Sequence, residues 1–288
     1  MEEGVVTTVL LPVALGIIML GLGLSLTPAD FKRVLQYPKA VAVGLFCQMA
    51  ILPAACLGIA HLFALPPELA VGLMLLAASP GGATANLFSH LAKGDVALNI
   101  TLTAVNSVLS LVTLPLIVNF SLDHFIGADK SIPLQFSKVV SVVAIVLVPV
   151  FIGMAIRAKK ASLADRLDKP VRIVSAVFLI LLVVVSLIKE RANIGEYIQA
   201  VGLAALVFNL TSLAVGYFVP RLARVDPRQS IAIGMEIGIH NGTLAIAIAS
   251  SSSLLNNSTM AIPAAVYSII MFVTAGLFGY FVSRRPPI

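Results

Sequence analysis

Residues 79–86 read SPGGATAN and residues 235–243 read MEIGIHNGT, and both stretches interrupt segments that are otherwise apolar enough to cross a membrane. Glycine, proline and polar residues break a helix there, which leaves backbone N–H and C=O groups that lipid cannot satisfy. Such breaks are tolerated only where they are buried in protein or line a polar cavity. One break in each half of a chain is typical of the binding site of a secondary transporter.

The sequence around the two breaks is too apolar for a soluble protein. Its 288 residues are 59% hydrophobic and 11% charged, whereas soluble domains carry roughly 25% charged residues. We predict an all-α, polytopic membrane protein in a lipid bilayer, with about nine transmembrane helices of the usual length of ~20 residues. They lie near residues 5–26, 40–63, 68–91, 96–120, 137–157, 171–188, 198–220, 229–251 and 260–282. Continuous apolar runs exclude a porin-type barrel, whose strands alternate.

The basic residues are distributed unevenly between the predicted loops. Fifteen of the 19 Lys and Arg residues fall on one side of the membrane, and four fall on the other: Lys130, Lys138, Lys189 and Arg191. Cytoplasmic loops are enriched in Lys and Arg. We therefore predict an inner (cytoplasmic) membrane protein with a cytoplasmic C-terminus and an external N-terminus. The net charge of +6 reflects this topology and indicates no nucleic-acid partner.

The two halves of the chain resemble each other weakly. Gln48 lies in the middle of a predicted helix, and a turn with Pro66-Pro67 and then the first break follow. Asn209 lies in a similar place, and a turn with Asp226-Pro227 and then the second break follow. Because an odd number of spans separates the two units, the second would be inserted upside down. We predict inverted repeats within a single membrane transporter domain over residues 1–288.

Side chains that carry oxygen atoms concentrate around the breaks. Asn86 and Glu236 lie in the two breaks, and Asn99 and Thr103 are four residues apart on one helix face. Carboxylate, amide, hydroxyl and carbonyl oxygens are the ligands of hard cations such as Na⁺. The other interpretation is that such groups only hydrogen-bond between membrane helices. We prefer a cation site for these four residues and structural hydrogen bonds for a second group: Asn106, Ser107, Thr211 and Ser212.

Glu236 carries most of the prediction, because a carboxylate at membrane depth is costly and marks an ion or substrate pathway. No Lys or Arg falls within a predicted membrane core to neutralise it, so either a bound cation or a bound proton would do so. His240 follows four residues later. It could be a ligand, a proton carrier or a hydrogen-bond donor to backbone.

In the order and spacing of these motifs, the chain resembles the bile acid:sodium symporter (BASS) family, including its bacterial members. The resemblance rests on Pro80-Gly81-Gly82 with Asn86, on residues 91–98 (LAKGDVAL) and on residues 236–241 (EIGIHN). It implies a core domain that contains two crossing broken helices and a panel domain against which the core moves. The core would be about residues 40–120 and 198–282, and the panel about residues 5–26 and 137–188.

The resemblance also implies two sodium sites near the crossing. The first would use Asn86, Thr103 and Glu236; two further family positions, often serine, are Ala85 and Asn99 here. Ala85 has no side-chain oxygen, and the Asn99 amide could compensate for it.

The second implied site would use the Glu236 carboxylate again, together with four more residues: Gln48, the backbone carbonyls of Ile237 and Ile239, and the side chain of His240. Relatives that resemble bile acid transporters carry glutamine at the last position, and a neutral imidazole is a poor ligand for Na⁺. Whether the second site is weakened, lost or proton-sensitive stays open.

The implied substrate is a small organic anion rather than a bile acid. Relatives that bind bile acids have Trp-His-Asn in the last helix, whereas this chain has Ile270, Met271 and Phe272 and contains no tryptophan. A helix N-terminus at a break offers partial positive charge to an anion. The candidate contacts are Gly81, Gly82, Asn241, Gly242 and Thr243.

Together these features predict a sodium-coupled symporter of a small organic anion that works by alternating access. Na⁺ would be the coupling ion, and no organic cofactor is expected; protein partners cannot be predicted. The alternative is a proton-coupled transporter that uses Glu236 and His240. More remote alternatives are a ligand sensor without transport and an intramembrane enzyme, although no nucleophile or metal set accompanies that pair. The chain has no P-loop lysine motif, which argues against an ATP-driven pump.

Overall fold

The computed structural model describes residues 11–82, 84–127, 136–189, 194–251 and 254–284. These residues form helices and turns, and strand-like pairing is confined among them to one isolated bridge between Gly81 and His240. The helices are α2 (Leu11–Ser25), α3 (Pro28–Lys32), α4 (Pro38–Phe46), α5 (Leu52–Leu62), α6 (Pro67–Ala78), α7 (Ala85–Leu91), α8 (Val96–Phe125), α9 (Phe136–Lys159), α10 (Ala161–Lys189), α11 (Ile194–Leu222), α12 (Pro227–Gly238), α13 (Gly242–Ser250) and α14 (Ile262–Ser283). The predicted all-α class is confirmed.

Four helical stretches in the described part of the chain are long and apolar enough to span a membrane: Pro38–Leu62, Val96–Phe125, Gly195–Leu222 and Thr259–Ser283. The two predicted broken spans consist of shorter pieces, α6 with α7 and α12 with α13. The predicted span 5–26 begins outside the described residues. Lys130 and Arg191, which the topology prediction uses, also lie outside them. The count of about nine spans therefore stays a prediction.

Helix α10 begins ten residues before the span predicted at 171–188. The charged segment before Pro170 is helical and continues into the apolar part without interruption. Pro170 lies inside this helix, although proline removes a backbone hydrogen bond there. The polar segment therefore extends the helix.

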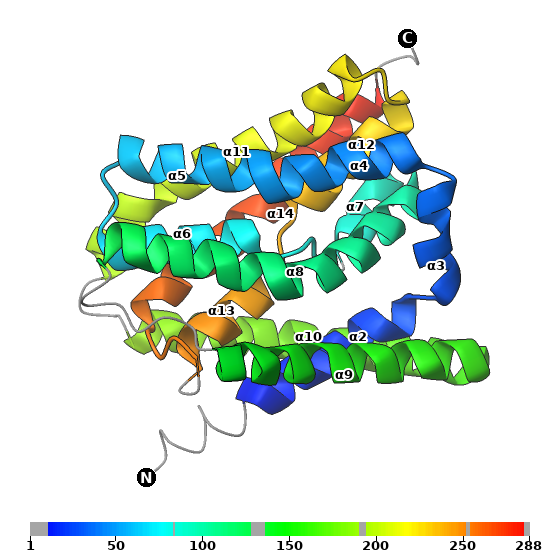
Figure 1. Ribbon diagram of the computed structural model, residues 1–288, viewed down its shortest axis with the longest axis horizontal. Helices are drawn as coiled ribbons and strands as arrows, with labels where there is room; N and C mark the ends of the chain where they lie inside the picture. The colour runs from blue at the N-terminus through cyan, green and yellow to red at the C-terminus, as the bar shows by residue number, and fades with distance from the viewer. Residues whose placement is uncertain (1–10, 83, 128–135, 190–193, 252–253, 285–288) are drawn as a thin grey trace.

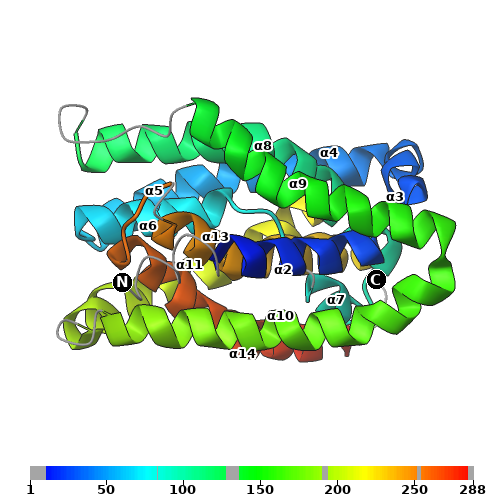
Figure 2. The same cartoon turned by 90° about the horizontal axis from the view of Figure 1, so that it is seen from below.

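Helices α2, α9 and α10 form a layer of their own, at the bottom of Figure 1, and Figure 2 shows α2 between the other two. Two glycines allow α2 and α9 to touch. A Cβ atom on Gly23 would lie 2.2 Å from the Val150 carbonyl oxygen, and one on Gly153 would lie 2.6 Å from the Leu20 carbonyl oxygen. Such small residues let membrane helices approach closely. The layer meets the other helices through contacts with α8, α13 and α14.

Helices α4 and α5 form one continuous helical stretch with a π turn at Cys47–Ile51 between them. The N–H of Leu52 bonds the carbonyl of Cys47, five residues earlier. Pro53 follows directly and has no N–H of its own to offer to the preceding turn. The π turn contains the predicted ligand Gln48, and such turns often occur at functional sites.

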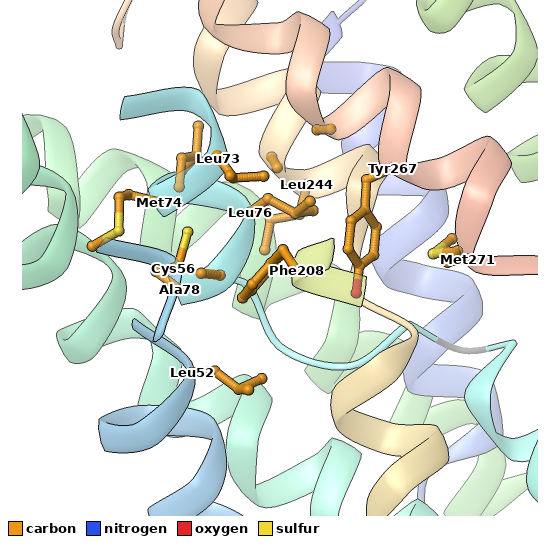
Figure 3. Close-up of a cluster of buried hydrophobic side chains, with 14 of the residues drawn as sticks. Leu52, Cys56, Leu73, Met74, Leu76, Ala78, Phe208, Leu244, Tyr267 and Met271 are labelled. Atoms are coloured by element: carbon orange, nitrogen blue, oxygen red, sulfur yellow. The ribbon is translucent and has the colours of Figure 1, made fainter. Parts of the chain in front are cut away.

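Several of the largest fully buried side chains lie where α6, α11 and α14 meet (Figure 3). Phe208 and Tyr267 lie beside each other there, with ring centroids 5.7 Å apart, and Leu73 and Leu76 lie nearby. This apolar cluster borders the polar crossing described next, since Phe208 and Tyr267 both contact His240.

Candidate functional site

The two breaks meet and pair with each other through their backbones. The N–H of Gly82 donates to the carbonyl of Ile239 at 2.7 Å, and the N–H of Asn241 donates to the carbonyl of Pro80 at 2.9 Å. Each break thus satisfies backbone groups that the other has lost from its helix, as backbone at membrane depth requires. The crossing is a short antiparallel contact between segments about 160 residues apart in sequence.

Side chains from neighbouring helices bind the carbonyl groups at the helix ends. Gln48 Nε2 donates to the carbonyls of Ala77 and Ser79 at 3.2 and 3.0 Å. Asn209 Nδ2 and Tyr267 Oη both donate to the carbonyl of Gly238 at 2.9 Å. The terminal carbonyls of α6 and α12 are therefore held in place, and the breaks have defined geometry.

Glu236 lies in the last turn of α12 rather than in the unwound segment, because the helix continues until the N–H of Ile239 bonds Met235. It is 1% exposed. Its Oε2 atom accepts a hydrogen bond from Thr103 Oγ1 at 2.6 Å. The carboxyl group also lies against the first break, since a Cβ atom on Gly81 would be 2.2 Å from Oε1. Glycine at position 81 leaves the space that this carboxyl group fills.

Four side-chain oxygens of predicted ligands are buried and have no hydrogen-bond partner among the described residues: Gln48 Oε1, Asn86 Oδ1, Asn99 Oδ1 and Glu236 Oε1. An unpaired buried polar atom costs about 1–3 kcal/mol, so such atoms call for an explanation. Asn99 and Gln48 are paired in the same way, through the amide nitrogen and not through the amide oxygen. Asn99 Nδ2 donates to the Ala232 carbonyl at 2.7 Å, and Asn99 Oδ1 has no partner among the described residues. This donor set fits a hard cation such as Na⁺, which prefers oxygen ligands.

The remaining predicted ligands lie at the same crossing. Thr103 Oγ1 bonds Glu236 and also the Asn99 carbonyl, at 3.0 Å. Ile237 is buried in the last turn of α12, and the Ile239 carbonyl already accepts the bond from Gly82. A carbonyl oxygen has a second lone pair, so this bond leaves it able to bind a cation.

His240 is held between aromatic rings and the first break. Its ring stacks on Phe208 at 5.6 Å with an interplanar angle of 13°, and it also contacts Tyr267 at 5.4 Å. Its Nδ1 lies 3.3 Å from the Ser79 carbonyl oxygen, which can only accept. Nδ1 of a neutral ring would therefore carry the hydrogen, and Nε2 would present a lone pair; Nε2 has no partner in the described part of the chain.

The candidate substrate contacts are more buried than an open binding surface would require. Asn241 Oδ1 caps α13 by accepting from the N–H of Leu244 at 3.0 Å. Gly242 packs against α14, where a Cβ atom would lie 2.1 Å from Ser268 Oγ. Thr243 is 8% exposed. The local role of Asn241 and Gly242 is thus to start α13 and to seat it on α14.

Two serines of the second polar group hydrogen-bond within their own helices, and not only between helices as predicted. Ser107 Oγ and Ser212 Oγ donate to carbonyls four residues earlier on their own helices, at 2.6 and 2.8 Å. A hydroxyl reaches its own helix without help from a neighbour, which explains the difference. Asn106 Nδ2 is buried without a partner among the described residues.

Two residues that support the second break had no assigned role in the sequence prediction. Tyr267 bonds the Gly238 carbonyl, and Thr274 Oγ1 bonds Asn209 Oδ1. Their only signal in the sequence is a hydroxyl group within an apolar helix. The partner of each lies on another helix, and the sequence does not reveal that pairing.

Known sodium-dependent transporters and cotransporters are similar to this chain over most of its length. A family model described as "Sodium Bile acid symporter family" matches residues 12–197. The uncharacterized sodium-dependent transporter YocS of Bacillus subtilis (strain 168) is 26% identical over 271 residues, which cover 94% of this chain and 82% of that protein. The probable sodium/metabolite cotransporter BASS1, chloroplastic, of Arabidopsis thaliana is 30% identical over 92% of this chain, and the match spans 66% of that protein. The ileal sodium/bile acid cotransporter of Oryctolagus cuniculus is 24% identical over 98% of this chain and 81% of that protein.

Proposed function

Because this chain belongs to the sodium bile acid symporter family, a family of membrane sodium-coupled transporters, we propose that it is a sodium-coupled symporter of a small organic anion. The observation that carries the proposal is that four buried side-chain oxygens of the predicted ligands, one of them on Glu236 itself, have no hydrogen-bond partner among the described residues. The ion pairs within the described residues are Arg33–Asp30 and Arg157–Asp165, and neither includes Glu236. Sodium would supply the missing counter-charge.

In this proposal Na⁺ acts by holding the two breaks together. Its ligands would come from α7, α8 and α12 at the first site, through Asn86, Asn99, Thr103 and Glu236. The carboxyl group contacts Gly81 of the first break and is itself carried by the helix of the second. A bound ion would therefore favour one geometry of the crossing, and the substrate would bind to that geometry.

Alternating access would arise from movement of the core, with α4–α8 and α11–α14, against the panel of α2, α9 and α10. Inverted repeats, about nine spans and a cytoplasmic C-terminus are part of the same proposal. The panel contacts α13, which begins at the second break, so a change at the crossing has a direct route to the panel. Sodium entry would contribute about 2.3 kcal/mol per charge for each 100 mV of membrane potential.

The proposed substrate class rests on the names of the relatives and on the absence of the expected bile acid motif from α14. The names of the relatives include metabolite and bile acid cotransport. This chain has Ile270, Met271 and Phe272 in α14, where the expected bile acid motif is absent. A small organic anion near the N-terminus of α13 fits the partial positive charge of that helix end.

The proposal is tested by sodium binding and by uptake with the same purified protein. The melting temperature is measured in NaCl and in KCl at equal ionic strength, for the unaltered chain and for Glu236→Gln. Proteoliposomes with an inward sodium gradient are then screened with radiolabelled small carboxylates and sulfonates. We expect sodium-selective stabilisation and gradient-driven uptake, both lost in Glu236→Gln. Equal stabilisation by Na⁺ and K⁺ would refute the sodium site.

Proton coupling is the second candidate function. It is supported by His240, which is buried and whose Nε2 has no partner among the described residues and could accept a proton. A proton could then neutralise Glu236 in place of Na⁺. This function predicts uptake that follows an imposed pH gradient and ignores replacement of Na⁺ by K⁺. Uptake that requires Na⁺ at fixed pH would exclude it.

A further inference from the structure

Two histidines meet at the end of the molecule opposite the basic loops, far from the crossing. His61 lies in the last turn of α5 and His124 in the last turn of α8, and both helices end on the left side of Figure 1. The two Nε2 atoms are 2.8 Å apart, and both residues are exposed. Nothing in the proposed transport cycle uses this pair.

We propose that His61 and His124 form a surface site for a divalent transition-metal ion such as Zn²⁺. Neutral imidazole nitrogen is a preferred ligand of such ions. Metal–nitrogen bonds of about 2.0–2.1 Å place two ligating nitrogens roughly 3.0–3.4 Å apart. The rings therefore need to separate by only a few tenths of an ångström, with the remaining coordination positions open to water.

The surroundings hold both rings in position for a shared ion. The ring of His124 stacks on Phe120 at 5.5 Å and meets Phe125 edge-on at 4.9 Å. The ring of His61 contacts the same Phe125 at 5.3 Å. These contacts restrict the rotamers of both histidines, which reduces the entropy lost when a metal binds. Both side chains also lie at helix C-termini, whose partial negative charge favours a cation.

The histidine site differs from the proposed sodium site in the chemistry of its ligands. The crossing offers oxygen atoms to a hard cation, whereas the pair offers two nitrogen atoms to a borderline one. A bound ion would join the ends of α5 and α8. On the proposed topology this face is external, so an ion in the surrounding medium could reach it.

The test uses tag-free protein, because a polyhistidine tag would bind the same metals. Zn²⁺ binding is measured by titration calorimetry for the unaltered chain, His61→Ala, His124→Ala and His90→Ala, with Mg²⁺ as the hard-cation control. His90 is an exposed histidine at the end of α7 and serves as the matched control. Circular dichroism and gel filtration check that each variant is folded.

We expect saturable binding of one Zn²⁺ per chain, lost in His61→Ala and in His124→Ala and unchanged in His90→Ala. Electron paramagnetic resonance with Cu²⁺ should show hyperfine coupling to two imidazole nitrogens in the unaltered chain. Retention of the Zn²⁺ site in either of the two variants would overturn the inference, as would the absence of saturable binding in the unaltered chain. Neither result would bear on sodium binding, which depends on other residues.

Discussion

The side-chain amides of Gln48 and Asn99 form hydrogen bonds in the same pattern at the crossing. Each amide nitrogen donates to a backbone carbonyl of a neighbouring helix, and each amide oxygen stays buried without a partner in the described part of the chain. The nitrogen contacts fix the direction of the oxygen, so a cation would find its ligands already oriented. Glu236 adds the charge that such a site needs, and Thr103 holds one of its oxygens.

At this scale the first prediction concerns the charge of Glu236. Glu236→Gln keeps the shape of the side chain and an oxygen that can accept from Thr103, but it removes the charge. If Na⁺ is present at 100 times its dissociation constant, it stabilises the unaltered chain by about 2.7 kcal/mol. We expect this increment to vanish in the variant, as measured by melting temperature in NaCl against KCl. A full sodium increment in Glu236→Gln would show that the carboxylate is not a ligand.

A second prediction concerns the space at Gly81. A Cβ atom there would lie 2.2 Å from Glu236 Oε1, so Gly81→Ala should displace the carboxylate and remove the sodium increment. Gly58→Ala is the matched control, because a Cβ atom at that helical position has nothing within 4 Å. The control should be neutral or slightly stabilising, by up to about 1 kcal/mol, since alanine favours a helix. Unchanged sodium titration curves for Gly81→Ala would contradict the geometry proposed for the site.

The third prediction concerns His240, whose ring lies next to the carbonyl that Gln48 also binds. His240→Gln replaces a nitrogen ligand with an amide oxygen, which Na⁺ prefers. We expect tighter sodium binding, measured by isothermal titration, and stabilisation at lower NaCl concentrations. Weaker binding would mean that the stacking of the imidazole on Phe208 supports the site more than an added oxygen does.

At the scale of elements, the close contact between α2 and α9 depends on the absence of a Cβ atom at glycine positions such as Gly23. Gly23→Ala would place a Cβ atom 2.2 Å from the Val150 carbonyl oxygen, whereas Gly16→Ala, on the same helix, finds its nearest neighbour at 3.8 Å. We expect the first variant to lose about 1–3 kcal/mol of stability, as overpacking does, and the second to lose little. Thermal unfolding of both in one detergent compares them. Equal melting temperatures would show that the two helices separate at little cost.

The elements themselves were largely predictable, and their joints were not. Long apolar runs predict helices such as α8, and the glycines and Pro80 predict the first break. The π turn at Gln48 and the continuation of α10 before Pro170 depend on how a proline is accommodated, which packing decides. Within the site, oxygen-bearing residues can be identified from composition. Which atom of each amide is paired depends on carbonyls that are 29 to 133 residues away.

At the scale of the whole molecule, the structure has two layers that meet at a few helices. The layer of α2, α9 and α10 contacts α13, and α13 starts at the crossing that carries the proposed ion site. The proposed sodium ligands themselves lie outside that layer, on α7, α8, α12, the π turn and the second break. An ion would therefore order one layer directly and the other only through contacts between them.

This division predicts where sodium changes backbone protection. Hydrogen exchange followed by mass spectrometry, in NaCl against KCl, should slow in peptides that cover residues 77–87 and 236–244. Peptides from α9 and α10 should exchange at nearly the same rate in both salts, because they supply no ligand. Protection confined to α9 and α10 would place the ion in the other layer.

The mutual pairing of the two breaks also has a consequence for biosynthesis. Gly82 and Asn241 each donate to a carbonyl of the opposite break, so neither break has its full set of hydrogen bonds until both have been made. A ribosome adds about 5–20 residues per second, and 159 residues separate Gly82 from Asn241. The second break is therefore synthesised roughly 8 to 32 seconds after the first at those rates. During that interval the nascent first half holds unsatisfied backbone within the membrane, and the insertion machinery or water must shelter it until the second half arrives.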